Sequence, residues 1–243
     1  MKLLKHFLLY NRRHLRTIFT EPLNKGSRLY FLYRYLVWHL FYKFLGRPYY
    51  VRLDNGKKTI VKPYPDHDAG EAHIWNKNVD YHQLDFIKKH LTPDSYIYDL
   101  GCNVGNRTWA LAHLIKGACL VDAGKDAIAR TTENLELNKL DPELYQIHHC
   151  ALGAEKGVVH FTNLGGASTI NKVVKESGDN TYEVEMITLD DLNQRTGITP
   201  RFIKIDVEGQ DLNVLKGASQ LLTKDELKLI MVEATDSEML RGL

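Results

Sequence analysis

Short apolar runs and amphipathic segments alternate along the second half of the chain. The apolar runs have the length of buried strands, and the segments between them repeat their apolar positions with a helical period. Buried strands separated by helices indicate an α/β fold with a parallel sheet that is covered on both faces. The predicted strands are 96–100, 118–122, 145–151, 202–206 and 227–233, and the predicted helices are 107–114, 125–140 and 211–222.

Other segments precede or join this sheet. The hairpin turn Asp54-Asn55-Gly56 has the residues that a tight turn between two strands requires. The predicted elements outside the parallel sheet are a hairpin with strands at 49–53 and 58–61, a helix over 75–90, and antiparallel additions at 158–162 and 182–188.

The first 48 residues have a different pattern. Residues 29–45 are almost continuously apolar and aromatic, but Arg34, His39 and Lys43 interrupt the run. Each of these is costly at the centre of a bilayer, so we expect an amphipathic helical arm and not a spanning helix. Three interpretations stay open: the arm lies on a membrane surface, packs on the rest of the chain, or packs on a second copy in a homo-oligomer.

Charge also separates the arm from the rest. Residues 1–50 have a net charge of +9 and residues 51–243 a net charge of −7. A basic arm that holds 13 of the 24 aromatic residues suits anionic lipid headgroups, whereas the acidic remainder makes nucleic acid an unexpected partner. Three cysteines form no even-numbered framework, so we expect buried free thiols, and we interpret residues 1–10 as an amphipathic helix and not as a signal peptide. We expect a cytoplasmic protein, at the inner face of a membrane if the arm binds lipid.

The turn after the first predicted strand carries the first candidate chemistry, because ligands bind at the carboxyl ends of parallel strands. It reads Asp99-Leu-Gly101-Cys-Asn103-Val-Gly105-Asn106, and glycine lets the backbone turn and approach a ligand closely. Asn103 and Asn106 stand where a dinucleotide fingerprint requires glycine or alanine. Asp99 would repel phosphate but attract an ammonium group. S-adenosylmethionine carries such a group and is the predicted cofactor.

Asp122 ends the second predicted strand, 21 residues after Gly101. A carboxylate at that place can accept both ribose hydroxyls of a nucleoside. The loop and the acid together predict a nucleoside cofactor. A nicotinamide-dependent oxidoreductase is the alternative that Asn103 and Asn106 disfavour.

Three ionisable side chains alternate at the end of the fourth predicted strand, where Lys204, Asp206 and Glu208 share one side. A carboxylate beside an acceptor hydroxyl can orient it and take its proton as a new bond forms. Asp206 is the first candidate for this role and Glu208 the second, with Lys204 holding a carboxylate in place. A structural ion pair that fixes the turn is the competing interpretation.

The acceptor pocket is less clearly marked. His73, Trp75 and Tyr81 are candidates because a ring face suits a sugar, although packing explains each equally well. No metal site is expected: His148-His149-Cys150 alternate sides of a strand, and the acidic loop at 66–73 is interpreted as a solvated rim. Residues 163–168 are a candidate lid.

Several motifs resemble those of a known family, the FkbM methyltransferases. The most specific is 202–218, which contains Lys204-Ile205-Asp206-Val207-Glu208-Gly209. The others are Asp99-x-Gly101-x-Asn103-x-Gly105, Asn134-Leu-Glu-Leu-Asn138, Ala151-Leu152-Gly153 and Ile187-Thr188-Leu189-Asp190-Asp191.

The resemblance implies a doubly wound, Rossmann-like methyltransferase sheet and S-adenosylmethionine as the methyl donor. It implies transfer to a hydroxyl of a carbohydrate, glycolipid or related metabolite, and it places Ala151 at the cofactor. Asp122 departs from the family, which has Glu-Pro after that strand. No sequence after Ala234 matches the usual last pair of antiparallel strands, so we expect a sheet shortened at its C-terminal end.

The predicted division is therefore a helical arm at 1–48 and a methyltransferase domain at 49–243, with a lead-in at 49–90 and a cofactor-binding core at 91–243. A shortened sheet also fits a non-catalytic cofactor-binding or scaffold protein, which is the alternative function.

Overall fold

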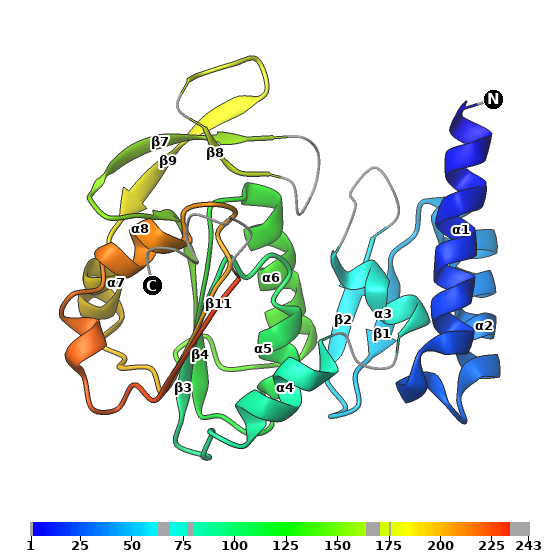
Figure 1. Ribbon diagram of the computed structural model, residues 1–243, viewed down its shortest axis with the longest axis horizontal. Coiled ribbons are helices and arrows are strands. Elements are labelled where there is room, and N and C mark those ends of the chain that lie inside the picture. The colour runs from blue at the N-terminus through cyan, green and yellow to red at the C-terminus, as the bar shows by residue number, and fades with distance from the viewer. Residues whose placement is uncertain (1, 63–68, 77–79, 164–170, 175, 234–243) are drawn as a thin grey trace.

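The protein contains a central parallel sheet with helices on both faces, and a helical arm lies at one edge of the molecule (Figure 1). The computed structural model describes residues 2–62, 69–76, 80–163, 171–174 and 176–233. The candidate lid from 164 on, the acidic loop at 66–68 and the C-terminal segment after 233 lie outside the described residues.

The central sheet has five parallel strands in the order β11-β10-β3-β4-β5. The order reverses between β3 and β10, and this reversal is the switch point at which doubly wound sheets bind ligands. The strands are β3 (Tyr96–Leu100), β4 (Gly117–Asp122), β5 (Tyr145–His149), β10 (Phe202–Ile205) and β11 (Leu229–Val232).

Helices cover the sheet on both sides, which confirms the predicted doubly wound α/β fold (Figure 1). Side chains alternate across each strand: Ile97 packs in one apolar cluster, whereas Tyr98 and Leu100 pack in the cluster on the opposite face. The helices on one face are α4 (Tyr81–Lys88), α5 (Asn106–Leu111) and α6 (Lys125–Leu137), and those on the other are α7 (Leu189–Thr196) and α8 (Asp211–Lys216).

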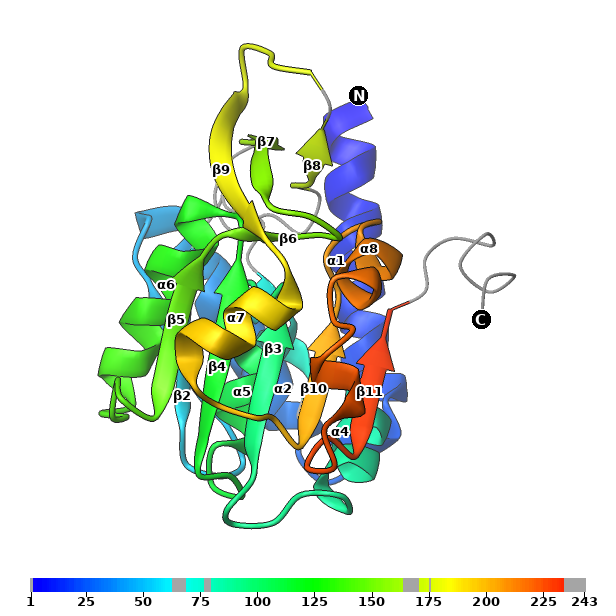
Figure 2. The same ribbon diagram turned by 90° about the vertical axis from the view of Figure 1, so that its left-hand side faces the viewer.

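A second, smaller sheet lies beyond the carboxyl ends of the central strands (Figure 2). Its order is β6-β9-β7-β8, and β7 and β9 pair antiparallel as predicted, but in this separate sheet and not as additions to the central one. The predicted strand at 145–151 is divided at Cys150, because β6 pairs with β9 and not with β4. The strands are β6 (Ala151–Leu152), β7 (Gly157–Thr162), β8 (Val173–Val174) and β9 (Thr181–Ile187).

Two predicted helices are wrong in their extent. The helix over 75–90 is two helices, because α3 (Ala72–Trp75) ends early and Asp80 has a φ of 58°, which a continuous right-handed helix does not allow. The helix over 211–222 ends at Lys216, and η4 (Leu221–Thr223) follows as a separate 3-10 turn.

The arm packs against the lead-in segment. Phe31, Tyr35 and Trp38 are buried with Val51 of the hairpin and Ile74 of α3. None of the described helices is long and apolar enough to cross a bilayer. The elements are α1 (Lys2–Thr20), η1 (Pro22–Asn24), α2 (Arg28–Val37), the π-helical turn η2 (Trp38–Lys43), β1 (Tyr49–Arg52), β2 (Lys58–Val61) and η3 (Ala69–Glu71).

Candidate active site

The turn between β3 and α5 is held in a left-handed conformation at three places. Gly101, Asn103 and Gly105 have φ values of 69°, 51° and 76°. A Cβ on Gly101 would lie 1.7 Å from the backbone oxygen of Asp206, so the turn touches the end of β10. The glycine that the sequence marks for close approach therefore brings together the two strand ends at the switch point.

Gly101→Ala is expected to lower the free energy of unfolding by about 2–3 kcal/mol, because the new methyl group meets backbone and the positive φ is strained. Gly178→Ala is the matched control, since no atom lies within 4 Å of a Cβ built there. Urea unfolding of both variants tests this, and equal midpoints would contradict the packing described.

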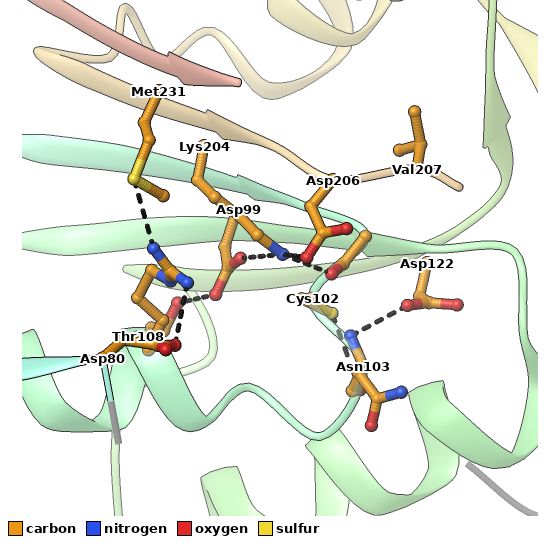
Figure 3. Close-up of polar contacts among 12 residues, drawn as sticks. Asp80, Asp99, Cys102, Asn103, Thr108, Asp122, Lys204, Asp206, Val207 and Met231 are labelled. Atoms are coloured by element: carbon orange, nitrogen blue, oxygen red, sulfur yellow. Dashed lines mark hydrogen bonds and ion pairs between the residues drawn. The ribbon is translucent and has the colours of Figure 1, made fainter. Parts of the chain in front are cut away.

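Asp122 stands at the end of β4 with its carboxylate held by two backbone N–H groups. Asn103 donates to Oδ2 at 2.8 Å (Figure 3), and Gly124 donates to Oδ1 at 2.8 Å. Burial raises the pKa of this carboxyl above its ordinary value, although the two donors oppose the shift. The carboxylate is thereby fixed at the wall of a cavity that Gly101 and Ala151 also line.

This cavity has two different sides. The space between its walls is about 760 Å³, which includes the part that opens to solvent. The segment after β10 contributes the polar groups Asp206, Glu208 and Gln210. The apolar lining comes from β4, α6 and the small sheet with its approach, namely Val121, Ala127, Cys150, Leu152, Phe161 and Val173.

Lys204 links the cofactor loop to the polar side. Its ammonium donates to the backbone oxygen of Gly101 at 2.7 Å and lies 3.0 Å from Asp206 Oδ2 and 3.6 Å from Asp99 Oδ1 (Figure 3). Burial alone would lower the pKa of Lys204, but the charges of Asp99 and Asp206 raise it. The hydroxyl of Thr108 also donates to Asp99 at 2.8 Å. Lys204 is thus a buried cation between two carboxylates.

Further carboxyl groups surround Asp206. Burial and the charge of Asp206 raise the pKa of Glu208, which has a φ of 51°. Glu233, just after β11, shares a hydrogen bond with Asp206, and its pKa is raised by the charge of Asp206 and by burial. Sequence reasoning missed Glu233, although the end of the neighbouring parallel strand marks its position.

The predicted cofactor residues fall into two groups. Gly101, Asn103, Asp122 and Ala151 line the cavity. Three others support the loop. Asp99 is buried and contacts Lys204 and Thr108. Gly105 precedes α5, and Asn106 accepts a hydrogen bond from Thr59.

The candidate acceptor residues His73 and Trp75 are not among the described residues that line this cavity. His73 is buried under the arm, where burial and the charge of Arg34 lower its pKa to about 4. Trp75 stacks on His14 with ring centroids 3.6 Å apart. Tyr81 begins α4. The structure thus places His73 and Trp75 in packing environments, away from Asp206.

The reversed strand order, the left-handed loop and the fixed carboxylate define a nucleoside-binding Rossmann-like domain of the methyltransferase type. The chain belongs to the Methyltransferase FkbM domain family, which matches residues 48–241. It is a methyltransferase, and S-adenosylmethionine is its cofactor.

Individual methyltransferases are also similar to this chain. A probable cobalt-precorrin-6B C(15)-methyltransferase (decarboxylating) from Methanobrevibacter smithii is 29% identical over 159 residues, which are 65% of this chain and 75% of that protein. A methyltransferase FkbM structure from Methylobacillus flagellatus KT is 18% identical, covers 58% of this chain and 33% of its own, and has a TM-score of 0.44. A SAM-dependent methyltransferase structure from Agrobacterium tumefaciens is 12% identical and has a TM-score of 0.47. The match covers 78% of this chain and 54% of that chain.

Proposed function

We propose that the protein transfers a methyl group from S-adenosylmethionine to a hydroxyl oxygen of a carbohydrate, glycolipid or related metabolite. The observation that supports this proposal most strongly is the position of Asp206 in the cavity. Its carboxylate, held by Lys204 at 3.0 Å, lines the same cavity as the ribose-binding candidate Asp122. A base and a nucleoside site in one cavity are what oxygen methylation requires.

The residues present fit the cofactor. The carboxylate of Asp122 is fixed by two backbone donors and can accept the ribose hydroxyls. The apolar wall that includes Leu152 and Phe161 suits an adenine ring. The acidic groups Asp206 and Glu208 suit the positive charge of a sulfonium.

When bound, S-adenosylmethionine supplies an electrophilic methyl group on a positive sulfur. Asp206 would accept the proton that the acceptor hydroxyl loses on methylation. Lys204, 3.0 Å from the carboxylate, keeps Asp206 oriented. The turn at Gly101 fixes the distance between β3 and β10, which aligns the two reactants.

The polar lining of the cavity suits an acceptor that carries several hydroxyl groups. Glu208 and Gln210 follow β10 and present a carboxyl and an amide that can bond to hydroxyl groups. These residues therefore support a carbohydrate or glycolipid acceptor.

The experiment is label transfer. The protein is incubated with methyl-labelled S-adenosylmethionine and separate glycan and lipid extracts, and the product is treated with base and with acid to distinguish ethers from esters. Label in a base-stable ether of a sugar-containing product is expected. Label only in protein, in an ester or on nitrogen would contradict the proposal.

The substitution Asp122→Asn tests the cofactor site separately from methyl transfer. The amide cannot accept both ribose hydroxyls, so the affinity for S-adenosylhomocysteine is expected to fall by about tenfold. Asp126→Ala, four residues on at an exposed position in the first turn of α6, should leave the affinity unchanged. Calorimetric titration measures both, and equal affinities in Asp122→Asn and the wild type would remove Asp122 from the cofactor site.

A further inference from the structure

Helix α2 and the π-helical turn η2 are apolar on two opposite sides. One side carries Phe31, Tyr35 and Trp38, whose side chains are at most 4% exposed in the cluster with the hairpin. The opposite side carries a row spaced by three or four residues, which a helix brings onto one face. This second row is the outer stripe, and it consists of Leu29, Tyr33, Leu36, Leu40 and Phe44.

The outer stripe is open to solvent. Its side chains are 79%, 63%, 46%, 65% and 84% exposed, in chain order. Scattered exposed apolar residues are ordinary on a protein surface, but a continuous row along one helix marks an interaction site. Helices α1 and α2 form one edge of the molecule, with the hairpin between them and the central sheet, so a broad surface can approach this edge (Figure 1).

Positive charge stands around the stripe. Lys25 and Arg28 lie at its amino end and Arg47 at its carboxyl end, and all three are exposed. None of the three has an ion-pair partner within the ranges that the structure describes. Glu21 is the single acidic residue in positions 1–50. The surface therefore offers apolar rings and chains between uncompensated cations.

We propose that the outer stripe binds the surface of an anionic membrane, with α2 lying parallel to the bilayer plane in the headgroup layer. Leucine, tyrosine and phenylalanine insert among the headgroups, and the flanking cations attract the lipid phosphates and carboxylates. A second copy fits this face less well, because pairing two stripes would bring two arms with a net charge of +9 together. This binding requires no methyl transfer and is separate from the proposed function.

Vesicle sedimentation tests the proposal with the full chain. The wild type is expected to sediment with vesicles of phosphatidylcholine and phosphatidylserine, to bind phosphatidylcholine alone more weakly, and to be released by added salt. The double variant Leu40→Ser, Phe44→Ser is expected to bind the mixed vesicles about tenfold more weakly. Both positions are exposed, at 65% and 84%, so the fold should be kept, and circular dichroism and the urea midpoint check it.

Phe86→Ser is the matched control, because Phe86 is 53% exposed on α4 and lies outside the stripe. Its vesicle binding should equal that of the wild type. A wild type that ignores both vesicles, or equal binding by the double variant and the wild type, overturns the proposal. A dimer in light scattering that the double variant dissociates, without vesicle binding, assigns the stripe to a second copy and overturns it as well.

Discussion

Lys204→Met is expected to lower the free energy of unfolding by about 3–5 kcal/mol, as removal of one partner from a buried charge pair does. The lysine side chain is 6% exposed and that of Asp99 only 3%, so Asp99 loses its cation where water reaches it poorly, whereas Asp206 is 28% exposed. Methionine keeps most of the volume of the side chain, and the loss is therefore electrostatic. Chemical unfolding at neutral pH measures it.

A second substitution distinguishes charge from packing. Asp99→Asn in the Lys204→Met background removes one unpaired charge and is expected to restore part of the lost stability. Lys216→Met, at an exposed position in the last turn of α8, should change stability by less than about 0.5 kcal/mol. A Lys204→Met protein as stable as the wild type would mean that the carboxylates do not depend on the lysine.

The parallel sheet could be predicted from the sequence because its strands are buried on both faces. All five strands were located within a few residues, and the loop after β3 and the acid after β4 follow from the rule for strand ends. Helix α7 was not predicted. Its beginning was visible as a capping box, in which Thr188 and Asp191 each accept from the other's backbone N–H.

Tertiary contacts explain what the pattern did not show. The separate small sheet depends on β6 pairing with β9, residues that are 35 positions apart at Ala151 and Met186. The lining residue Phe161 comes from that sheet, so no local signal identifies it. Similarly, His73 and Trp75 are residue types that are typical of a sugar-binding pocket. Only the tertiary structure shows that the arm covers them.

The catalytic roles of Lys204, Asp206 and Glu208 stay predictions. Their alternation along a strand is wrong for Glu208, because β10 ends at Ile205 and Glu208 has a φ of 51°. Glu233 joins them because the pairing of β10 with β11 brings Ile205 beside Val232, the residue before Glu233. Four ionisable groups therefore meet at one end of two neighbouring strands.

Asp206→Asn is expected to lower turnover by about 100-fold or more, because asparagine cannot accept the hydroxyl proton. The affinity for S-adenosylhomocysteine should stay close to that of the wild type, since Asp122 and the apolar wall are unchanged. Labelled methyl transfer and calorimetry measure the two quantities. Unchanged turnover would remove Asp206 from the mechanism, and a parallel loss of affinity and stability would make it a structural ion-pair partner of Lys204.

The variant Glu233→Gln is expected to change the pH dependence of turnover, which a purely structural role of Glu233 would leave unchanged. The charge of Asp206 raises the pKa of Glu233, so Glu233 takes up a proton at a higher pH than an isolated glutamic acid. That proton is shared with Asp206 and weakens it as a base, so turnover of the wild type should fall as the pH decreases through this raised pKa. Glutamine keeps a hydrogen-bond donor but does not titrate, and the acidic limb of the turnover profile should move to lower pH. An unmoved limb would separate Glu233 from the proton that Asp206 accepts.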